Sequence, residues 1–215
     1  MRPNLVLVPT AGERQVLLAA LGDSCRIELC GFGPIAASAR TAALVARHAP
    51  ARVLLAGIAG RFDDRLAIGS AHSFSAVACY GVGAGTGAAF EPAAALGWPQ
   101  WPGDASGDEA AIGDVIACAG LPAAGLLLTA CAASADAADV AWRRRLFPAA
   151  VAEDMEGYGV ALACRLAGVP LQIVRGISNT AGDRDKGRWQ IGPALEAAGE
   201  LARTLLAPPA QESPR

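Results

Sequence analysis

Short apolar runs alternate with longer alanine-rich segments along most of the chain, and this alternation limits the folds it can adopt. Segments with the apolar spacing of a helix lie at residues 13–21, 35–48, 136–146, 157–167 and 193–206. Runs of strand length lie at residues 5–8, 26–30, 53–57, 71–79, 126–129, 152–155 and 171–175. Strands and helices in this order predict an α/β fold. We expect a three-layer α/β/α sandwich around a central, mainly parallel (mixed) sheet.

The length of the chain suits one domain. With 215 residues, a folded chain covers about 70% of the surface that its unfolded form exposes. We expect a single domain over residues 1–207 and a disordered, proline-rich tail over residues 208–215. Residues 81–107 are rich in glycine, proline and tryptophan without a regular period, so we expect a long loop with a short helix there.

Composition argues against several kinds of partner. The net charge is -2 without a basic stripe, so we expect no nucleic acid partner. The chain contains no uninterrupted run of roughly 18 apolar residues, so no membrane span is predicted. The first apolar run is too short for a signal peptide. The six cysteines form no C-x-x-C pair and there are only two histidines, which argues against a metal site. Reduced cysteines suit a cytoplasmic protein.

Two glycine-containing segments are predicted at strand ends. Gly31-Phe32-Gly33-Pro34-Ile35-Ala36 has the G-x-G-x-x-A spacing of a dinucleotide-binding turn. It follows the second strand, and no acid that could bind a ribose hydroxyl comes before Phe62, so we expect no nicotinamide or flavin cofactor. The second segment, Ala56-Gly57-Ile58-Ala59-Gly60, ends a buried strand, and its small residues let a ligand approach backbone N–H groups; a plain turn is the alternative.

Two acids lie at the starts of predicted helices. Glu13 begins the first helix, where a carboxylate ordinarily caps the helix or interacts with its dipole. Glu156 lies in Glu153-Asp154-Met155-Glu156-Gly157, between a strand and an alanine-rich helix. Acids in such a run are usually solvated or paired, but the position between a strand and a helix favours an acid that faces a cavity.

A dense polar cluster stands out in the last third of the chain. Arg175-Gly176-Ile177-Ser178-Asn179 is expected at the end of a buried strand, and Gly182-Asp183-Arg184-Asp185-Lys186-Gly187-Arg188-Trp189 follows it. In open α/β sheets, ligands bind outside the carboxyl ends of the strands. The sequence therefore predicts that these polar groups and the Glu156 segment belong to one functional site.

The residues around Glu156 carry a family resemblance. Met155-Glu156-Gly157, preceded by Phe147-Pro148 and followed by the Arg175–Asn179 segment, resembles the nucleoside phosphorylase/nucleosidase superfamily. The resemblance extends to both glycine segments and Glu13, so it covers nearly the whole chain. Within that superfamily, the closing motif with Arg184 and Trp189 resembles the futalosine hydrolases.

This resemblance implies a phosphorylase/hydrolase-like fold, a purine nucleoside substrate, a homo-oligomer and no cofactor. It implies hydrolysis of the N-glycosidic bond of futalosine to hypoxanthine and dehypoxanthine futalosine, in the alternative menaquinone pathway.

The resemblance also implies roles for individual residues. Glu13 is the expected general base for water, and Glu156 is expected to bind the ribose hydroxyls and favour the positive charge that develops on the sugar. Met155 is expected to pack on the ribose or the base. Residues Gly57, Ile58, Ala59, Gly60 and Ser178 complete the expected substrate-binding set.

Asn179 is the residue that best separates the possible leaving groups. Hypoxanthine presents an acceptor at O6 and a donor at protonated N7, and an amide offers one donor end and one acceptor end. Adenine presents two donors, and the adenine-releasing nucleosidases of the superfamily have an aspartate at this position. The sequence therefore favours a 6-oxopurine, and a role in a turn is the alternative for Asn179.

Arg184 and Trp189 are candidates to bind the carboxyphenyl group of futalosine. A guanidinium can hold the carboxylate, and an indole can stack on the ring. The alternative is a network of ion pairs among the mixed charges of residues 182–188.

Three other functions stay open. Phosphorylases need an anion site, but no arginine cluster joins Arg14 near residues 9–13, so hydrolysis is favoured. Another purine nucleosidase, acting on aminodeoxyfutalosine or on methylthioadenosine and S-adenosylhomocysteine, is the nearest alternative. A purine-binding module without activity is the alternative from a different class, and the presence of both Glu13 and Glu156 argues against it.

Overall fold

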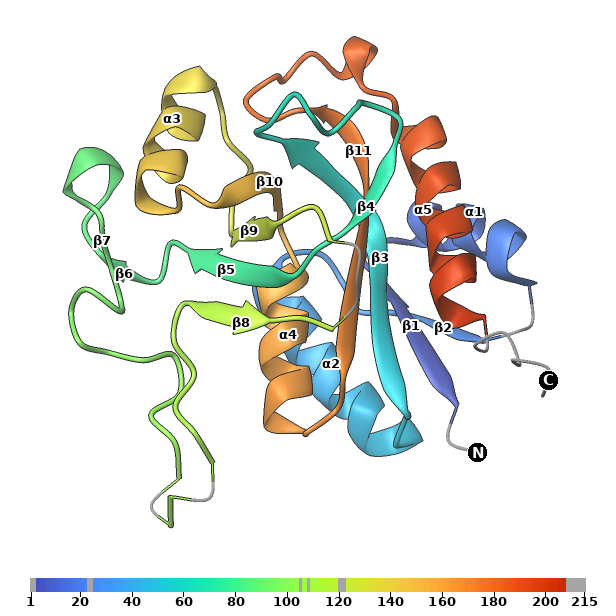
Figure 1. Ribbon diagram of the computed structural model, residues 1–215, viewed down its shortest axis with the longest axis horizontal. Helices are drawn as coiled ribbons and strands as arrows, with labels where there is room; N and C mark the ends of the chain where they lie inside the picture. The colour runs from blue at the N-terminus through green and yellow to red at the C-terminus, as the bar shows by residue number, and fades with distance from the viewer. Residues whose placement is uncertain (1–2, 23–24, 105, 108, 120–122, 208–215) are drawn as a thin grey trace, which may run out of the picture.

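A computed structural model describes residues 3–22, 25–104, 106–107, 109–119 and 123–207. A central sheet separates two pairs of helices: α2 packs with α4, and α1 packs with α5 on the other side (Figure 1). The predicted α/β/α sandwich is confirmed. The tail predicted over residues 208–215 lies outside the described residues. Among the described residues, no helix is long and apolar enough to cross a membrane.

The elements of the first half are β1 (Asn4–Val8), α1 (Ala11–Leu21), β2 (Arg26–Leu29), α2 (Pro34–His48), β3 (Arg52–Arg61), β4 (Ala71–Ser73), β5 (Ala76–Tyr80), β6 (Gly83–Ala84), η2 (Gly87–Ala89) and β7 (Glu91–Pro92). The second half contains β8 (Val115–Ala117), β9 (Leu126–Ala130), α3 (Ala137–Leu146), β10 (Ala150–Asp154), α4 (Gly157–Leu166), β11 (Leu171–Thr180), η3 (Lys186–Arg188) and α5 (Ile191–Leu206).

The sheet is mixed and is centred on β3. Its strand order is β2-β1-β3-β10-β9-β5-β8, and β11 pairs with both β3 and β4. Strand β3 is parallel to β1 and β11, but β10 meets the end of β3 in antiparallel orientation, with Glu153 opposite Gly60. Because the two strands are antiparallel there, the residues after Glu153 run back along β3 towards Gly57. The acidic segment is thereby placed beside the middle of β3.

Two of the predicted strands are longer than their apolar runs. Strands β3 and β11 continue to Arg61 and Thr180 because they pair with each other as far as these residues. Residues 56–60 are therefore part of β3, as expected of a segment that ends a buried strand, and the plain turn that was the alternative is excluded. Likewise, Ser178 and Asn179 lie inside β11 rather than after it.

Other differences lie in the segment between β3 and β9. The run at residues 71–79 is two strands, because β4 pairs with β11 whereas β5 pairs with β9. Strand β8 has no counterpart among the predicted runs. Residues 81–107 contain the small hairpin of β6 and β7 with the short 3-10 helix η2 between them, in line with the predicted loop and short helix.

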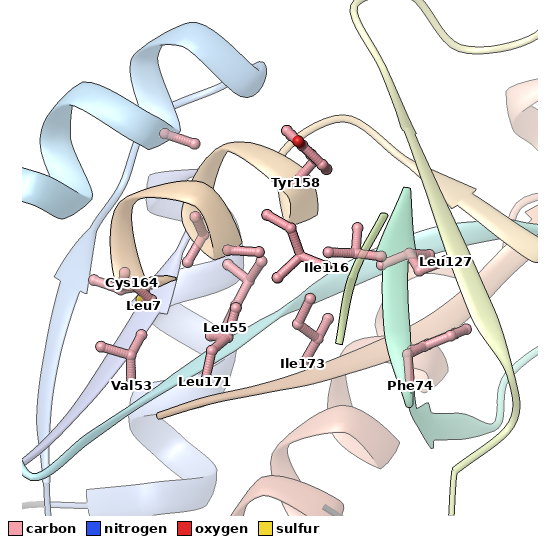
Figure 2. Packing of buried hydrophobic residues seen from close by; sticks show 14 of the residues in the cluster. Leu7, Val53, Leu55, Phe74, Ile116, Leu127, Tyr158, Cys164, Leu171 and Ile173 are labelled. Carbon is pink, nitrogen blue, oxygen red and sulfur yellow. The ribbon is translucent and has the colours of Figure 1, made fainter. Parts of the chain in front are cut away.

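Helix α4 packs tightly on the sheet and on α2. Tyr158 and Cys164 of α4 join Leu55 of β3 and Ile173 of β11 in the largest hydrophobic cluster (Figure 2). Towards α2, a Cβ on Gly159 would lie 2.1 Å from the carbonyl oxygen of Pro34. Only a glycine permits this approach, which brings the first turn of α4 to the first turn of α2.

Candidate active site

Arg175 lies at the centre of a buried charged cluster. Its side chain is fully buried on β11, and its Nε donates a hydrogen bond of 3.0 Å to Oδ2 of Asp154. Its Nη2 also donates to Asp154 Oδ2 and lies 3.4 Å from Oε2 of Glu156. A buried charge is stable only when it is paired and hydrogen-bonded, and these two carboxylates supply the pairing.

Asp154, at the end of β10, has partners on both carboxylate oxygens. Oδ1 accepts a hydrogen bond of 2.6 Å from the Thr129 hydroxyl, on the neighbouring strand β9. Oδ2 also accepts a hydrogen bond of 2.9 Å from the backbone N–H of Gly157, at the start of α4. The carboxylate therefore links three parts of the fold, β9, α4 and β11, without contact with solvent.

Glu156 occupies the N-cap position of α4 and is buried, with 4% of its surface exposed. Its Oε1 accepts a hydrogen bond of 3.0 Å from the backbone N–H of Gly33, which precedes α2. Burial raises the pKa of Glu156 to about 7; Asp154 adds to this rise, whereas Arg175 opposes it. Glu156 therefore binds a proton more readily than an exposed carboxyl group does.

Glu13 is both a helix cap and a wall of the same site. Its Oε2 accepts hydrogen bonds from the Thr10 hydroxyl at 2.6 Å and from the Thr10 backbone N–H at 3.0 Å. This is the capping box that begins α1. Its Oε1 accepts a longer hydrogen bond of 3.3 Å from the backbone N–H of Ile58 on β3. The capping interaction expected of an acid in this position is present, and the second oxygen faces β3.

Gly57 marks the point at which Glu13 and Arg175 approach each other. A Cβ on Gly57 would lie 2.3 Å from Nη1 of Arg175 and 2.8 Å from Oε1 of Glu13. Nη1 is buried and has no hydrogen-bond partner among the described residues. The guanidinium and the carboxylate oxygen therefore pack directly over Gly57, where a side chain would displace them, and this brings the unpaired N–H of Arg175 close to Glu13.

Ser178 and Asn179 lie further along β11, at an irregularity in its pairing with β3. The Ser178 hydroxyl lies 2.8 Å from Oδ1 of Asn179 and 3.3 Å from the carbonyl oxygen of Ala59, and both can accept its hydrogen bond. Nδ2 of Asn179 donates a hydrogen bond of 2.8 Å to the carbonyl oxygen of Thr180. Both side chains are buried, so the amide is held with defined donor and acceptor ends.

The remaining members of the expected substrate-binding set lie around this cluster. Met155 is half-buried between β10 and Glu156, and Ile58 is half-buried on β3. Gly60 packs closely against Ala181, where an added Cβ would lie 3.3 Å from the Cα atom. The fold therefore brings these residues to the same part of β3 and β10.

Arg184 and Trp189 form a separate pair on the loop before α5. The Arg184 guanidinium carbon lies 5.6 Å from the centre of the Trp189 ring, and the indole N–H donates to the carbonyl oxygen of Asp183 at 3.0 Å. Arg188 forms ion pairs with Asp183 at 2.8 Å and Asp185 at 3.4 Å. Within the described residues, no hydrogen bond or ion pair connects this loop with Glu13, Glu156 or Arg175.

The sequence did not single out Asp154 and Thr129, and it did not assign a role to Arg175. Side chains alternate along a strand, so Glu153 and Asp154 point to opposite faces of β10. Glu153 forms a buried ion pair of 2.8 Å with Arg143 of α3, whereas Asp154 pairs with Arg175. Because adjacent side chains of a strand point to opposite faces, two adjacent acids at its end have different partners, and this pattern in the sequence could have distinguished Asp154 from Glu153.

The fold and the buried acid cluster define a class of enzymes that act on nucleosides. A family model described as "Phosphorylase superfamily" matches residues 6–207, and the chain belongs to this family. The futalosine hydrolase of Streptomyces coelicolor is 36% identical over 206 residues, which cover 88% of this chain and 83% of that protein. The futalosine hydrolase of Thermus thermophilus is 32% identical over 179 residues, with 82% and 79% covered.

Adenosine-type nucleosidases are also similar to this chain. The 5'-methylthioadenosine/S-adenosylhomocysteine nucleosidase of Shewanella oneidensis is 31% identical over 167 residues, with 74% of this chain and 68% of that protein covered. Among solved structures, the native futalosine hydrolase of Helicobacter pylori strain 26695 has a TM-score of 0.77 at 15% identity, covering 96% of this chain and 98% of that one. The Neisseria meningitidis nucleosidase with methylthio-immucillin-A has a TM-score of 0.76 at 18% identity, with 96% and 99% covered. These structures share the fold.

Proposed function

We propose that this protein is a futalosine hydrolase, which uses water to split futalosine into hypoxanthine and dehypoxanthine futalosine. The observation that carries this choice is the buried amide of Asn179, whose Oδ1 accepts a hydrogen bond from the Ser178 hydroxyl. An amide complements the O6 acceptor and the N7 donor of hypoxanthine. The similarity to futalosine hydrolases over most of the chain supports the same reading.

In the proposed reaction, water adds to C1′ of the ribose and the bond from C1′ to the purine breaks. The bonding electrons leave with the purine, which takes up a proton from solvent, and Glu13 later releases to solvent the proton that it accepts from water. Glu13 accepts a proton from the water, and its Oε1 shares the space above Gly57 with Nη1 of Arg175. The guanidinium N–H binds the water oxygen while Glu13 takes the proton, which fixes the direction of attack.

Glu156 is proposed to bind the ribose hydroxyls through its carboxylate. As the bond to the purine breaks, the sugar becomes positively charged, and an ionised carboxylate nearby stabilises it. Met155 precedes Glu156 and packs on the sugar or the base. Arg184 and Trp189 bind the carboxyphenyl group at the outer end of the substrate, because the guanidinium is exposed and already stacked on the indole.

We also propose a homo-oligomer in the cytoplasm that serves the alternative menaquinone pathway. Phe32 and Ile35 flank Gly33 with 65% and 81% of their surfaces exposed, and a second copy of the chain could cover them. The six cysteines of the sequence form no C-x-x-C pair, and reduced cysteines suit this compartment. Sedimentation of the purified protein tests the oligomer: a single monomeric species would contradict it.

The experiment that tests the function is release of the free base, followed by liquid chromatography in phosphate-free buffer. Futalosine, its 6-amino analogue, inosine and methylthioadenosine are offered in parallel, and the Glu13→Gln protein serves as the blank for contaminating activity. Hypoxanthine from futalosine alone is expected. Faster release of adenine from the 6-amino analogue would make the protein another purine nucleosidase, and release only after addition of phosphate would make it a phosphorylase. Binding without release of base would make it a binding module.

A further inference from the structure

The site contains one guanidinium and three carboxylates, so one positive charge lies close to three possible negative charges. Arg175 is fully buried, and Glu13, Asp154 and Glu156 have exposed fractions of only 4% to 8%. With every group ionised, the cluster would carry two uncompensated negative charges in a region without access to solvent. Such an excess of buried charge is strongly unfavourable, and a carboxyl group in this setting retains a proton more readily.

The contacts of Arg175 are shared unequally. Nε and Nη2 both donate to Oδ2 of Asp154, which also has Thr129 and Gly157 as donors. Glu156 is left with a long contact of 3.4 Å to Nη2 and one hydrogen bond of 3.0 Å from Gly33. Of the two acids that contact Arg175, Asp154 therefore has the better stabilised negative charge.

We propose that Asp154 is a positioning residue: it fixes Arg175 with Nη1 over Gly57 and compensates most of the positive charge of the guanidinium, so that Glu156 keeps a proton in the free protein. Asp154 acts through Arg175 and does not contact the substrate. The inference rests on the proposed function only for its effect on turnover, because the proton on Glu156 is a property of the free protein.

Each element around Glu156 contributes to this balance. Arg175 of β11 and the N–H of Gly33 before α2 favour the ionised carboxylate, whereas Asp154 of β10 and Glu13 of α1 disfavour it. Cys30 follows β2, and burial raises the pKa of its thiol to about 12, so it adds no charge. Burial is the largest influence and raises the pKa of Glu156 to about 7. The ionised carboxylate that stabilises a cationic sugar therefore forms in the free protein as the pH rises through about 7.

The direct test is a titration of Glu156 by carbon-13 NMR in protein labelled at the glutamate carboxyl groups, with Glu156→Gln to assign the signal. In the unchanged protein, the midpoint is expected at about 7. In Asp154→Asn, a negative neighbour is removed and Arg175 is released to Glu156. The midpoint is therefore expected to fall by about 1 to 2 pH units, a ten- to hundredfold loss of proton affinity. An unchanged or higher midpoint would overturn the proposal.

Two further variants keep the test decisive. Asp63 forms a comparable pair with Arg65, at 2.6 Å on the surface, so Asp63→Asn is the matched control and its Glu156 midpoint stays the same. If Asp154→Asn does not fold, Thr129→Val replaces it. This change removes one hydrogen-bond donor to Asp154, which makes the ionised form of Asp154 less stable. The midpoint of Glu156 is then expected to fall as well, by a smaller amount. No movement in Thr129→Val would then count against the proposal.

The kinetic test uses the dependence of kcat/KM on pH. The proposal predicts that kcat/KM for futalosine rises through pH 7 as Glu156 ionises, and that the acidic limb moves to lower pH in Asp154→Asn. A merely structural role of Asp154 would lower kcat/KM equally at every pH. If no nucleoside releases a base, the proposed function fails, whereas the NMR titration still decides the role of Asp154.

Discussion

The backbone N–H of Gly33 donates a hydrogen bond of 3.0 Å to Oε1 of Glu156, which lies 123 residues further along the chain. This contact joins the turn before α2 to the first turn of α4. It depends on the close packing of the two helices, where Gly159 passes the carbonyl oxygen of Pro34. An acid at the end of one strand is thereby held by the glycine turn that follows another.

Glu156 makes the folded protein sensitive to pH. Its pKa is 4.5 in an exposed carboxyl group and about 7 in the folded protein, so the folded state holds a proton that the unfolded state releases. The free energy of unfolding is therefore expected to fall by about 3 kcal/mol as the pH rises from below 4.5 to above 7. In Glu156→Gln this contribution is absent. Urea unfolding of both proteins at pH 5 and pH 8 measures the difference. An equal change in the free energy of unfolding between the two pH values in both proteins would contradict the prediction.

Replacement of Glu13 by glutamine is expected to lower kcat by about 10²- to 10⁴-fold, because the amide cannot take a proton from water. The helix is expected to remain, since the side-chain oxygen of glutamine still accepts from Thr10. Turnover of futalosine and circular dichroism measure the two effects. Glu200→Gln, on the exposed face of α5, is the matched control. Turnover near that of the unchanged protein would remove Glu13 from the mechanism.

Gly57→Ala tests the space between Arg175 and Glu13. The added Cβ would lie 2.3 Å from Nη1 of Arg175, so the guanidinium must move. A displacement of about 1 Å in a catalytic group lowers rates by about 10²-fold, and we expect at least this loss in kcat. Gly192→Ala on α5 is the control, because its Cβ meets nothing within 4 Å. Full activity of Gly57→Ala would show that the displaced groups do not take part.

Asn179→Asp is expected to change which base is released. A carboxylate complements the two donors of a protonated adenine and repels the O6 acceptor of hypoxanthine. We expect the ratio of kcat/KM for the 6-amino analogue to that for futalosine to rise by about 100-fold or more. Base release from the two nucleosides in competition measures this ratio.

Ser178→Ala provides a graded comparison for that prediction. Loss of the hydroxyl frees Oδ1 of Asn179 from its 2.8 Å contact, so the amide can turn and the preference for futalosine is expected to weaken without reversal. An unchanged preference in both variants would assign the choice of base to other residues.

Arg184→Met is expected to raise KM for futalosine by about tenfold through loss of a charge-assisted contact with the carboxylate. The kcat for futalosine is expected to stay the same, because no hydrogen bond or ion pair connects Arg184 with Glu13, Glu156 or Arg175 among the described residues. Arg188→Met is the control, because Arg188 is exposed on the same loop but paired with Asp183 and Asp185. Equal effects of both changes would mean that they act through the loop and not through the substrate.

The sequence by itself determined the layers of this fold and the identity of several polar groups. Apolar runs separated by alanine-rich helical segments permit only a sheet with helices on both faces. The amide of Asn179 and the acids Glu13 and Glu156 could be read from the chain, because their chemistry depends on residue type.

Only the tertiary structure decided which of these groups meet. The apolar runs predicted ends for β3 and β11 that come several residues too early. The two strands continue through residues of mixed polarity because they pair with each other there. The pairing of Asp154 with Arg175 and of Glu153 with Arg143 depends on which face of β10 each acid occupies. The unused N–H of Arg175 near Glu13 arises from contacts between residues far apart in the chain, and these form only when the sheet and the helices pack together.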